Sequence, residues 1–508
     1  MKFRALEICD SYKLDHRRQY PPGTTKVYSN WTPRKSHVPG VDKVVFFGLQ
    51  ALIQQIHEAF DEFFLADVED ICADYEENIT QILGPNDVGV EHIRALHNLG
   101  YLPLKFMALP EGTEVPVRVP MFTVENTVDE FFWLVNYLET WLSSELWMPC
   151  TSATQAKHFR NMLDAHALKT TGSTAGVEFQ GHDFSMRGHA GVQAAAASGA
   201  AHLLSFVGTD TLPAKSWAKK YYDAKEPIAL SVAATEHSVM CAGGKESEFD
   251  TYERLLDLYP SGILAVVSDT WDLWNVITNI LPDLKEKIIA RDGKLVIRPD
   301  SGDPADIICG LNTAEGDTGR SARGRVDFSS HQPEDLGVIE LLWETFGGTV
   351  NELGYKVLDP HIGAIYGDSI TYDRADDICT RLAEKGFAST NVVFGLGSFF
   401  YQGGWHGAKP GWITRDTFGF AMKATYVVRD GKGQPIFKDP VTDSGTKKSA
   451  KGLLGVIECD DGLCLMDGLS ESHYESLNIS GLNQMRVVYE DGEAYIRQQF
   501  NDIRFFEM

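Results

Sequence analysis

The segment LVIRPDSGDP, residues 295–304, brings together side chains that could bind a phosphorylated sugar. An apolar run ends in Arg298 and Asp300, and because side chains alternate along a strand, these two should point to the same face. An arginine binds phosphate through its fork of donors, whereas an aspartate accepts hydrogen bonds from ribose hydroxyls or helps to hold Mg²⁺. Asp303 follows in a sharp turn whose backbone amides could open a helix suited to an anion. A structural arginine–aspartate pair at a turn fits the same residues equally well.

A second candidate is the turn Gly395-Leu396-Gly397-Ser398, which follows the apolar run NVVF. Its small residues let backbone N–H groups approach a phosphate closely, although an ordinary tight turn explains them too. The complete G-x-G-x-x-G fingerprint is absent because Phe400 stands at the third glycine position. The turn therefore does not indicate a dinucleotide-binding fold.

His237, preceded by Glu236, also follows an apolar run, and Asp269 follows the next one. An aspartate in this position could orient the imidazole of a catalytic histidine. The alternatives are that His237 is a packed or surface residue and that Asp269 caps a helix beginning at Trp271. The sequence does not separate these interpretations.

The elements that must position these residues are short apolar runs rich in Val, Ile or Phe, each followed by a polar cluster and a helix-like segment. From about residue 177 to 395 this alternation is typical of βα units and a parallel sheet. The predicted strands are Val177–Gln180, Leu203–Val207, Ile228–Val232, Ile263–Val267, Leu295–Ile297, Ile362–Tyr366 and Asn391–Phe394. About seven parallel strands indicate a βα barrel, whose active site forms at the carboxyl ends of the strands. Polar residues end strands in any protein, but their recurrence at every predicted strand end favours one common site.

The flanking segments differ from this pattern. The first part of the chain combines predicted helices at Gln50–Phe64 and Phe131–Trp147 with a few strands. The tail alternates strands with Asp-Gly and Gly turns, at Tyr426–Val428, Leu453–Ile457, Met485–Tyr489 and Ala494–Gln498. We therefore predict an α/β protein with an irregular βα barrel at 166–397 and an α+β domain built from 1–165 and 398–508.

The composition narrows the class of protein. The chain has 508 residues, 43% of them hydrophobic, and a formal net charge of -25, which argues against a broad nucleic-acid-binding face. Its eight cysteines show no zinc or redox spacing. The charged start does not fit a secretory signal, and no apolar run reaches the ~18 residues of a membrane span. We therefore expect a reducing, cytoplasmic location and no membrane or nucleic-acid partner.

Taken together, the chain resembles the nicotinamide phosphoribosyltransferases, which are type II phosphoribosyltransferases that act as dimers. The resemblance runs almost end to end and rests on many ordered motifs. They are Asp10-Ser11-Tyr12-Lys13, Gln19-Tyr20-Pro21-Pro22, Phe122-Thr123-Val124-Glu125-Asn126-Thr127, His182-Asp183-Phe184, Arg187-Gly188, Gly208-Thr209-Asp210-Thr211, Glu236-His237-Ser238, Val267-Ser268-Asp269, Ile297-Arg298-Pro299-Asp300-Ser301-Gly302, Gly367-Asp368, Thr414-Arg415-Asp416 and Phe437-Lys438-Asp439-Pro440.

The resemblance implies a reaction in which the pyridine nitrogen of nicotinamide displaces pyrophosphate from phosphoribosyl pyrophosphate, with Mg²⁺, as a salvage route to NAD. It implies that Phe184 and the partner's Tyr12 sandwich the pyridine ring. Arg187 should bind the carboxamide oxygen and Asp210 its NH₂ group, which would favour nicotinamide over nicotinic acid. If Asp210 instead caps a helix beginning at Leu212, the choice of base stays open.

The same resemblance assigns the phosphoribosyl half of the site. Asp300, Gly367 and Asp368 should hold the ribose hydroxyls and Arg298 the pyrophosphate. Gly397 and Ser398 should take the nucleotide phosphate, with Arg415 and Lys423 reaching in from the second subunit. His237 is expected to be phosphorylated by ATP beside Glu236 and Asp269, and Asp10 and Arg34 complete the expected site residues. The implied assembly is a homodimer with shared active sites, and the magnesium ligands are not assigned.

The chain departs from the family pattern at a few places. Ser398 stands where the family has a glycine, Ala421 stands where serine is common, and the stretches 403–412 and 312–335 look like insertions. Three alternatives remain: a nicotinate phosphoribosyltransferase, a non-catalytic binding or signalling protein on the same fold, and a barrel hydrolase with paired carboxylates such as Asp300 and Asp368.

Overall fold

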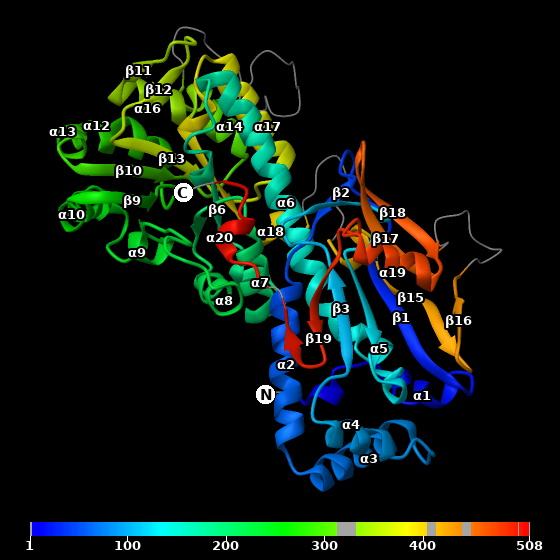
Figure 1. Cartoon of the computed structure of the whole chain (residues 1–508). Helices are drawn as coiled ribbons and strands as arrows, with labels where there is room; N and C mark the ends of the chain where they lie inside the picture. The colour runs from blue at the N-terminus through cyan, green and yellow to red at the C-terminus, as the bar shows by residue number, and fades with distance from the viewer. Residues whose placement is uncertain (1–2, 312–331, 404–412, 439–448, 496, 507–508) are drawn as a thin grey trace, which may run out of the picture. The chain divides into compact units, whose positions relative to one another are not determined.

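The chain forms two compact units (Figure 1). This computed structural model describes all residues except 1–2, 312–331, 404–412, 439–448, 496 and 507–508. Unit 1 comprises Met1–Thr154, Ser216–Lys225 and Thr414–Phe505, and unit 2 comprises Gln155–Lys215, Glu226–Ile413 and Phe506–Met508. Both chain ends therefore contribute to unit 1. Most of the two stretches that look like insertions, 312–335 and 403–412, lies outside the described residues.

Unit 1 is built on an antiparallel sheet of seven strands in the order β16-β15-β1-β5-β3-β19-β20. Its strands are β1 (Thr24–Pro33), β3 (Leu104–Ala108), β5 (Phe122–Asn126), β15 (Phe420–Arg429), β16 (Lys432–Pro435), β19 (Arg486–Glu490) and β20 (Glu493–Ala494). Two smaller pairs are β2 (Lys43–Val45) with β4 (Glu114–Pro116) and the hairpin β17 (Leu453–Cys459) with β18 (Gly462–Leu469). The strand-rich tail is confirmed, although β20 covers only the first residue of the predicted strand at 494–498.

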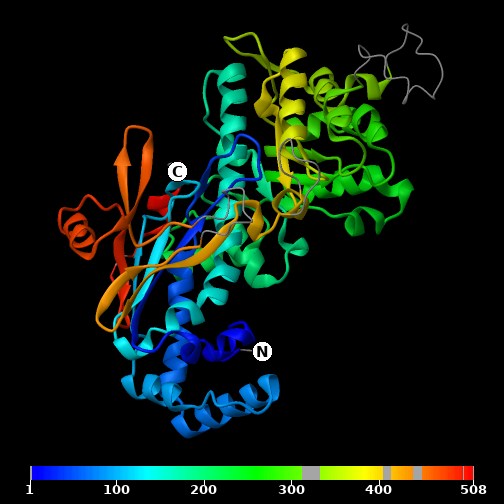
Figure 2. The ribbon, with the colours of Figure 1, turned by 90° about the vertical axis from the view of Figure 1, so that its right-hand side faces the viewer.

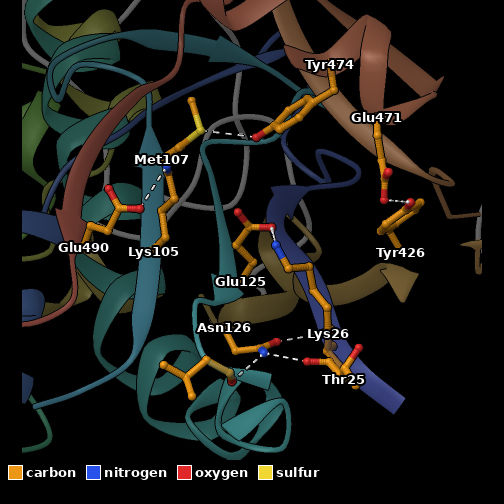
Figure 3. Close-up of polar contacts among 12 residues, drawn as sticks. Thr25, Lys26, Lys105, Met107, Glu125, Asn126, Tyr426, Glu471, Tyr474 and Glu490 are labelled. Carbon is orange, nitrogen blue, oxygen red and sulfur yellow. Dashed lines mark hydrogen bonds and ion pairs between the residues drawn. The ribbon is translucent and has the colours of Figure 1, made fainter. Parts of the chain in front are cut away.

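Polar contacts join the early and late strands of this sheet (Figure 3). Lys105 of β3 pairs with Glu490 of β19 at 3.1 Å. The buried Asn126 accepts a hydrogen bond from the backbone of Val27 and donates to the carbonyl of Thr25, which links β5 to β1. Helix α19 (Glu471–Ile479) lies beside the hairpin β17–β18 (Figures 1 and 2). Residues far apart in the chain thus stabilise one sheet.

The helices of unit 1 are mostly short. They are α1 (His16–Gln19), α2 (Leu49–Leu65), α3 (Val68–Leu83), α4 (Glu91–Leu99), α5 (Leu134–Tyr137), the first half of α6 (Glu139–Thr171), most of α8 (Leu212–Tyr222), α19 and α20 (Phe500–Ile503). Gly48 precedes α2 and offers no capping side chain. The buried carboxylate of Glu111 takes that role, accepting from the amides of Gly48 at 2.7 Å and Gln50 at 2.6 Å.

Unit 2 contains the predicted parallel sheet, in the order β7-β6-β14-β13-β10-β9-β8. The strands are β6 (Gly181–Asp183), β7 (Gly208–Thr209), β8 (Ala233–Ala234), β9 (Ser261–Val267), β10 (Asp292–Arg298), β13 (Ile362–Tyr366) and β14 (Val392–Leu396). A parallel bridge between Gly208 and Leu230 connects the edge strand β7 to the segment that enters β8, the other edge strand. The sheet therefore curls into an irregular barrel, and the predicted fold class is confirmed.

Three of the predicted strands were placed too early in the chain. Val177–Phe179 is a 3₁₀ helix, residues 203–205 form a turn after a helix, and residues 228–232 pair only through Leu230. The real strands begin four or five residues later and consist of Gly-His-Asp, Gly-Thr and Ala-Ala. The apolar runs that suggested strands are core residues such as Val177, Phe206 and Ile228, which are buried without joining the ladder. These apolar runs therefore indicate residues that are buried in the core, not residues that pair in the sheet.

Helices follow most strands of unit 2. They are the rest of α6, α7 (Val192–His202), α9 (His237–Cys241), α10 (Glu248–Leu258), α11 (Leu273–Asn275), α12 (Leu281–Asp283), α13 (Lys285–Ile289), α14 (Pro304–Cys309), α15 (Pro333–Leu336), α16 (Val338–Phe346), α17 (Tyr372–Glu384) and α18 (Ser398–Gln402), with a small hairpin of β11 (Gly348–Val350) and β12 (Lys356–Leu358). The core between sheet and helices is mainly aliphatic and includes an aromatic cluster in which Phe159 packs edge-on against Phe394 and Phe400. Within the described part of the chain, no helix is long and apolar enough to cross a membrane.

Candidate active site

The candidate site lies at the carboxyl-terminal edge of the unit 2 sheet, which we call the mouth. Because all seven strands are parallel, the residues that follow them leave the sheet at this one edge. They are Phe184 and Arg187 after β6, Asp210 after β7, Glu236 and His237 after β8, Asp269 after β9, Arg298 and Asp300 at the end of β10, Gly367 and Asp368 after β13, and Gly397 and Ser398 after β14.

Phe184 forms a platform at the mouth. Its backbone N–H donates to the carbonyl of Leu396 at 2.9 Å, which fixes the end of β6 beside β14. A Cβ atom on Gly395 would lie 2.6 Å from the Phe184 ring and 2.7 Å from the Cα of Gly367, so only glycine fits. The ring of His182 lies 4.7 Å from the Phe184 ring, centre to centre. The platform is thus held on several sides.

Asp210 sits next to this platform with an ionised carboxylate. His182 Nε2 lies 2.9 Å from Asp210 Oδ1, and the Ser231 hydroxyl donates to the same oxygen at 2.5 Å. Burial opposes ionisation, but these two hydrogen bonds and the charge of Arg298 together lower the pKa of Asp210. Its side chain remains 43% exposed, which leaves room for a ligand.

A second, fully buried carboxylate holds the strand ends together. Asp183 accepts hydrogen bonds from the backbone and hydroxyl of Ser185 and, at 3.0 Å, from the hydroxyl of Thr209. Its carbonyl accepts from the backbone N–H of Asp210 at 2.9 Å. Asp183 therefore connects β6 to β7 and fixes the position of the Asp210 backbone.

His237 and Asp269 face each other across the ends of β8 and β9. The distance from His237 Nε2 to Asp269 Oδ1 is 3.4 Å, and the histidine side chain is 49% exposed whereas the aspartate is only 7% exposed. The helix that follows is capped by Asp272, which accepts from two backbone amides. The interpretation that Asp269 is a helix cap is therefore wrong, and its carboxylate is available to the histidine.

Arg298 and Asp300 do not form the structural ion pair that the sequence left open, as judged from the residues that the structure describes. The Nε atom of Arg298 is buried and has no hydrogen-bond partner. Burial raises the pKa of Tyr366, and the nearby charges of Asp368 and Asp300 raise it further. A Cβ atom on Gly367 would lie 3.5 Å from Asp300 Oδ1, so Asp300 lies beside the end of β13, which Asp368 follows.

The turn after β10 leads into a helix, as expected. The start of this helix does not offer free amides to an anion. Asp303 caps α14 and accepts from the amides of Ala305 at 3.1 Å and Asp306 at 3.3 Å. Its carboxylate already occupies the amides that an anion would use.

The Gly-rich turn after β14 lies against the segment that carries Arg187. A Cβ atom on Gly188 would be only 2.0 Å from the hydroxyl oxygen of Ser398, so the two segments touch. The same test at Gly397 finds open space. Arg187 is exposed in the short 3₁₀ helix Met186–Gly188. The turn and the arginine therefore border the same part of unit 2.

The remaining predicted site residues belong to unit 1. Arg34 and Lys423 line a cavity of about 300 Å³, together with Arg118, which the sequence did not single out. Burial lowers the pKa of Lys423, Glu139 opposes this, and the charges of Arg34, Lys438 and Arg415 lower it further. Tyr12 is 62% exposed and its hydroxyl donates to Asp10 at 3.3 Å. Unit 1 thus presents a cationic group of its own.

Two residues beside Asp210 were missed at the sequence level. His182 and Ser231 were read as a strand-end residue and as part of a predicted strand at 228–232. His182 lies 28 residues and Ser231 21 residues from Asp210 along the chain. These separations do not indicate that the residues are in contact. The one available clue was the position of His182 two residues before Phe184.

The described part of the chain contains no group of three His, Cys, Asp or Glu side chains that could hold a metal ion.

Comparison with known proteins agrees with this architecture. The nicotinate phosphoribosyltransferase (NAPRTase) family matches residues 179–500, and the nicotinamide phosphoribosyltransferase N-terminal domain matches residues 5–104. The nicotinamide phosphoribosyltransferase of Acinetobacter baylyi is 48% identical over 520 residues, covering 99% of this chain and 97% of that protein. The enzyme of the same name from Mycoplasma pneumoniae is 36% identical and covers 88% and 94%.

Solved structures share the fold. Nicotinate-nucleotide pyrophosphorylase from Pyrococcus furiosus aligns with a TM-score of 0.53 and 15% identity, covering 98% of this chain and 93% of that one. Human nicotinic acid phosphoribosyltransferase aligns with a TM-score of 0.51 and 15% identity, covering 97% and 91%. Fold, mouth and family together define a pentosyltransferase. Within this class, the chain belongs to the nicotinamide phosphoribosyltransferase family.

Proposed function

We propose that the protein makes nicotinamide mononucleotide and pyrophosphate from nicotinamide and phosphoribosyl pyrophosphate, as a salvage step toward NAD. The observation that carries this proposal is the ionised Asp210 carboxylate beside the Phe184 platform. The names of the relatives from Acinetobacter baylyi and Mycoplasma pneumoniae support the same substrate.

Recognition of the base follows from these two residues. The pyridine ring stacks on Phe184, which fixes its plane and aims its nitrogen at the ribose carbon. The Asp210 carboxylate accepts a hydrogen bond from the amide NH₂ group, and Arg187 donates to the carboxamide oxygen. A nicotinate carboxylate would face Asp210 with like charge, which disfavours nicotinate relative to nicotinamide.

The transfer itself exchanges one bond at the ribose. The pyridine nitrogen forms a bond to the anomeric carbon while the bond to the pyrophosphate oxygen breaks, and positive charge builds up on the sugar. Asp300 and Asp368 accept from the ribose hydroxyls, and Arg298 binds the departing pyrophosphate. Gly397 and Ser398 hold the nucleotide phosphate through the open turn.

Magnesium fits this mouth as an ion brought with the substrate. Mg²⁺ usually keeps several waters and binds one or two carboxylates plus substrate phosphates, so it needs no protein cage. Asp300 and Asp368 are the carboxylates that would help to hold it, and the ion would neutralise charge on the pyrophosphate. This agrees with the lack of a three-ligand group in the described residues.

ATP and a second subunit complete the proposal. His237, exposed and paired with Asp269, is the group that ATP phosphorylates, with Glu236 beside it, and this coupling tightens substrate binding. The cationic residues of unit 1, Arg34, Arg415 and Lys423, together with Tyr12 and Asp10, reach the mouth of the partner in a homodimer. The alternative on the same fold is a nicotinate phosphoribosyltransferase.

Turnover of the purified protein with each base decides between them. We expect kcat/KM for nicotinamide to exceed that for nicotinate by at least about 100-fold, the discrimination that a few kcal/mol provides. Equal or better use of nicotinate would contradict the role of Asp210. The variant Asp210→Asn, which removes the charge but keeps the size, should lose most of this preference while still releasing pyrophosphate.

A further inference from the structure

We propose that His182 and Ser231 are positioning residues that fix the rotation of the Asp210 carboxylate and thereby set the preference for the base. This inference rests on the proposed function, because it concerns the site that selects nicotinamide.

The two donors approach one oxygen of Asp210 from different parts of the barrel. His182 belongs to β6 and lies 2.9 Å from Oδ1, and Ser231 lies two residues before β8 and 2.5 Å from the same atom. Oδ1 therefore has both of its lone-pair directions occupied. Oδ2 makes no hydrogen bond to any residue that the structure describes. The oxygen left for a ligand is thus defined.

His182 is itself held in place. Its side chain is only 12% exposed, and its ring lies against the Phe184 ring. A Cβ atom on Gly208 would be 2.6 Å from His182 Nδ1, so the absence of a side chain at Gly208 lets the imidazole reach Asp210. Because an ionised carboxylate only accepts hydrogen bonds, His182 must carry its hydrogen on Nε2. The same imidazole therefore supports both the aromatic platform and the selecting carboxylate.

This arrangement has two effects on the choice of base. First, the two donors occupy Oδ1 and leave Oδ2 as the oxygen that can accept the amide of a ring stacked on Phe184. Second, the donors stabilise the charged carboxylate, whereas a neutral carboxyl could donate to a nicotinate carboxylate and accept the wrong base. The lowered pKa of Asp210 agrees with the second effect.

The test compares variants that remove the hydrogen-bond donor at position 182 or 231 with variants that keep a donor at the same position. Ser231→Ala and His182→Leu remove the hydrogen bonds, whereas Ser231→Thr keeps a hydroxyl and His182→Gln keeps an N–H donor. We expect each removal to raise KM for nicotinamide about tenfold, the typical effect of one hydrogen bond to a charged group, with a smaller change in kcat. The ratio of kcat/KM for nicotinamide to that for nicotinate should fall by a similar factor, and Thr and Gln should restore most of it.

Two controls separate this inference from structural damage and from the proposed function. His473→Leu applies the same substitution to an exposed histidine of α19 and should leave all constants unchanged. Ser231→Ala removes a single atom and is the variant least exposed to misfolding. A wild-type enzyme without preference for nicotinamide would refute the proposed function. If the wild type prefers nicotinamide and Asp210→Asn abolishes this preference, but Ser231→Ala and His182→Leu leave the ratio unchanged, only the positioning role is refuted.

Discussion

His237 combines an exposed imidazole with a buried acidic neighbour. This arrangement suits a histidine that is phosphorylated and later loses its phosphate. The exposed ring can meet a nucleotide, while the buried Asp269 carboxylate lies 3.4 Å from Nε2. A buried carboxylate stabilises positive charge on an adjacent imidazole more than an exposed one does.

The variant His237→Ala should lose stimulation by ATP and keep slow synthesis of nicotinamide mononucleotide without ATP. The physical reason is that the phosphate acceptor is gone while Phe184, Asp210 and Arg298 remain. The measurement is the initial rate at low phosphoribosyl pyrophosphate, with and without ATP, alongside ATP hydrolysis. A variant that still responds fully to ATP would exclude the phosphohistidine.

At this scale the sequence predicted residue types better than residue partners. The sequence singled out Asp210, His237, Asp269, Arg298 and Asp300 because charged residues directly follow apolar runs. Whether each of these residues has a functional or a structural role depends on contacts between strands, which the sequence does not show. Asp269 could be a cap or a histidine partner, and only the position of Asp272 at the helix start resolved this. The pairing of His182 with Asp210 left no trace in spacing.

Among the elements, α7 ends in a buried histidine that connects a helix to the mouth. His202 Nδ1 lies 2.6 Å from the Tyr401 hydroxyl, and Nε2 lies 3.0 Å from the carbonyl of Gly208, just before Asp210. The hydroxyl donates to Nδ1, and Nε2–H donates to the carbonyl, so the neutral ring satisfies both contacts. Burial lowers the pKa of His202 to about 4.

This lowered pKa predicts a loss of stability in mild acid. Below about pH 6.5 the unfolded chain binds a proton at His202 that the folded protein refuses until about pH 4. The free energy of unfolding should therefore fall by up to about 1.4 kcal/mol per pH unit through this window. In His202→Gln this contribution disappears, so the curve of stability against pH should be flatter between pH 6.5 and 4. Urea unfolding at several pH values measures it.

The exposed His473→Gln is the matched control for this substitution, and its curve should follow the wild type. An unchanged slope in His202→Gln would contradict the assignment of a neutral buried ring.

How well the elements could be predicted depended on their length. The strand at 362–366 and the helix at 50–64 were placed almost to the residue because their apolar patterns are long and regular. The short strands β6, β7 and β8 were misplaced since backbone pairing, not apolar side chains, defines them. The helix predicted at Phe131–Trp147 is divided among a 3₁₀ helix at 129–131, α5 and α6, and α6 continues through Pro149 to Thr171.

At the scale of the whole molecule, the proposed site residues fall into two sets. Those of unit 2 follow the barrel strands, and those of unit 1 include Arg34 and Arg415 beside Lys423. If the two sets meet between subunits, a heterodimer can be built with one intact and one doubly damaged site. The activity of such a heterodimer distinguishes an active site shared between subunits from an active site formed within one chain.

We predict that a chain carrying Asp300→Ala and a chain carrying Lys423→Ala, each nearly inactive alone, recover activity when co-expressed. The heterodimer, purified through two different tags, should reach about half of the wild-type rate because one of its two sites is intact. Light scattering checks that it is a dimer. A stable heterodimer without activity, or a protein that stays monomeric, would rule out shared sites.

The placement of β1 in the middle of the unit 1 sheet has a consequence for synthesis of the chain. Asn30 of β1 and Lys423 of β15 pair across neighbouring strands although 393 residues separate them. At roughly 5–20 residues per second, β1 leaves the ribosome on the order of 20 to 80 seconds before β15 does. During this time the barrel strands of unit 2 emerge and find their partners, whereas one edge of β1 stays open to wrong pairing. Unit 1 is therefore the part of the nascent chain with the longest need for protection by chaperones.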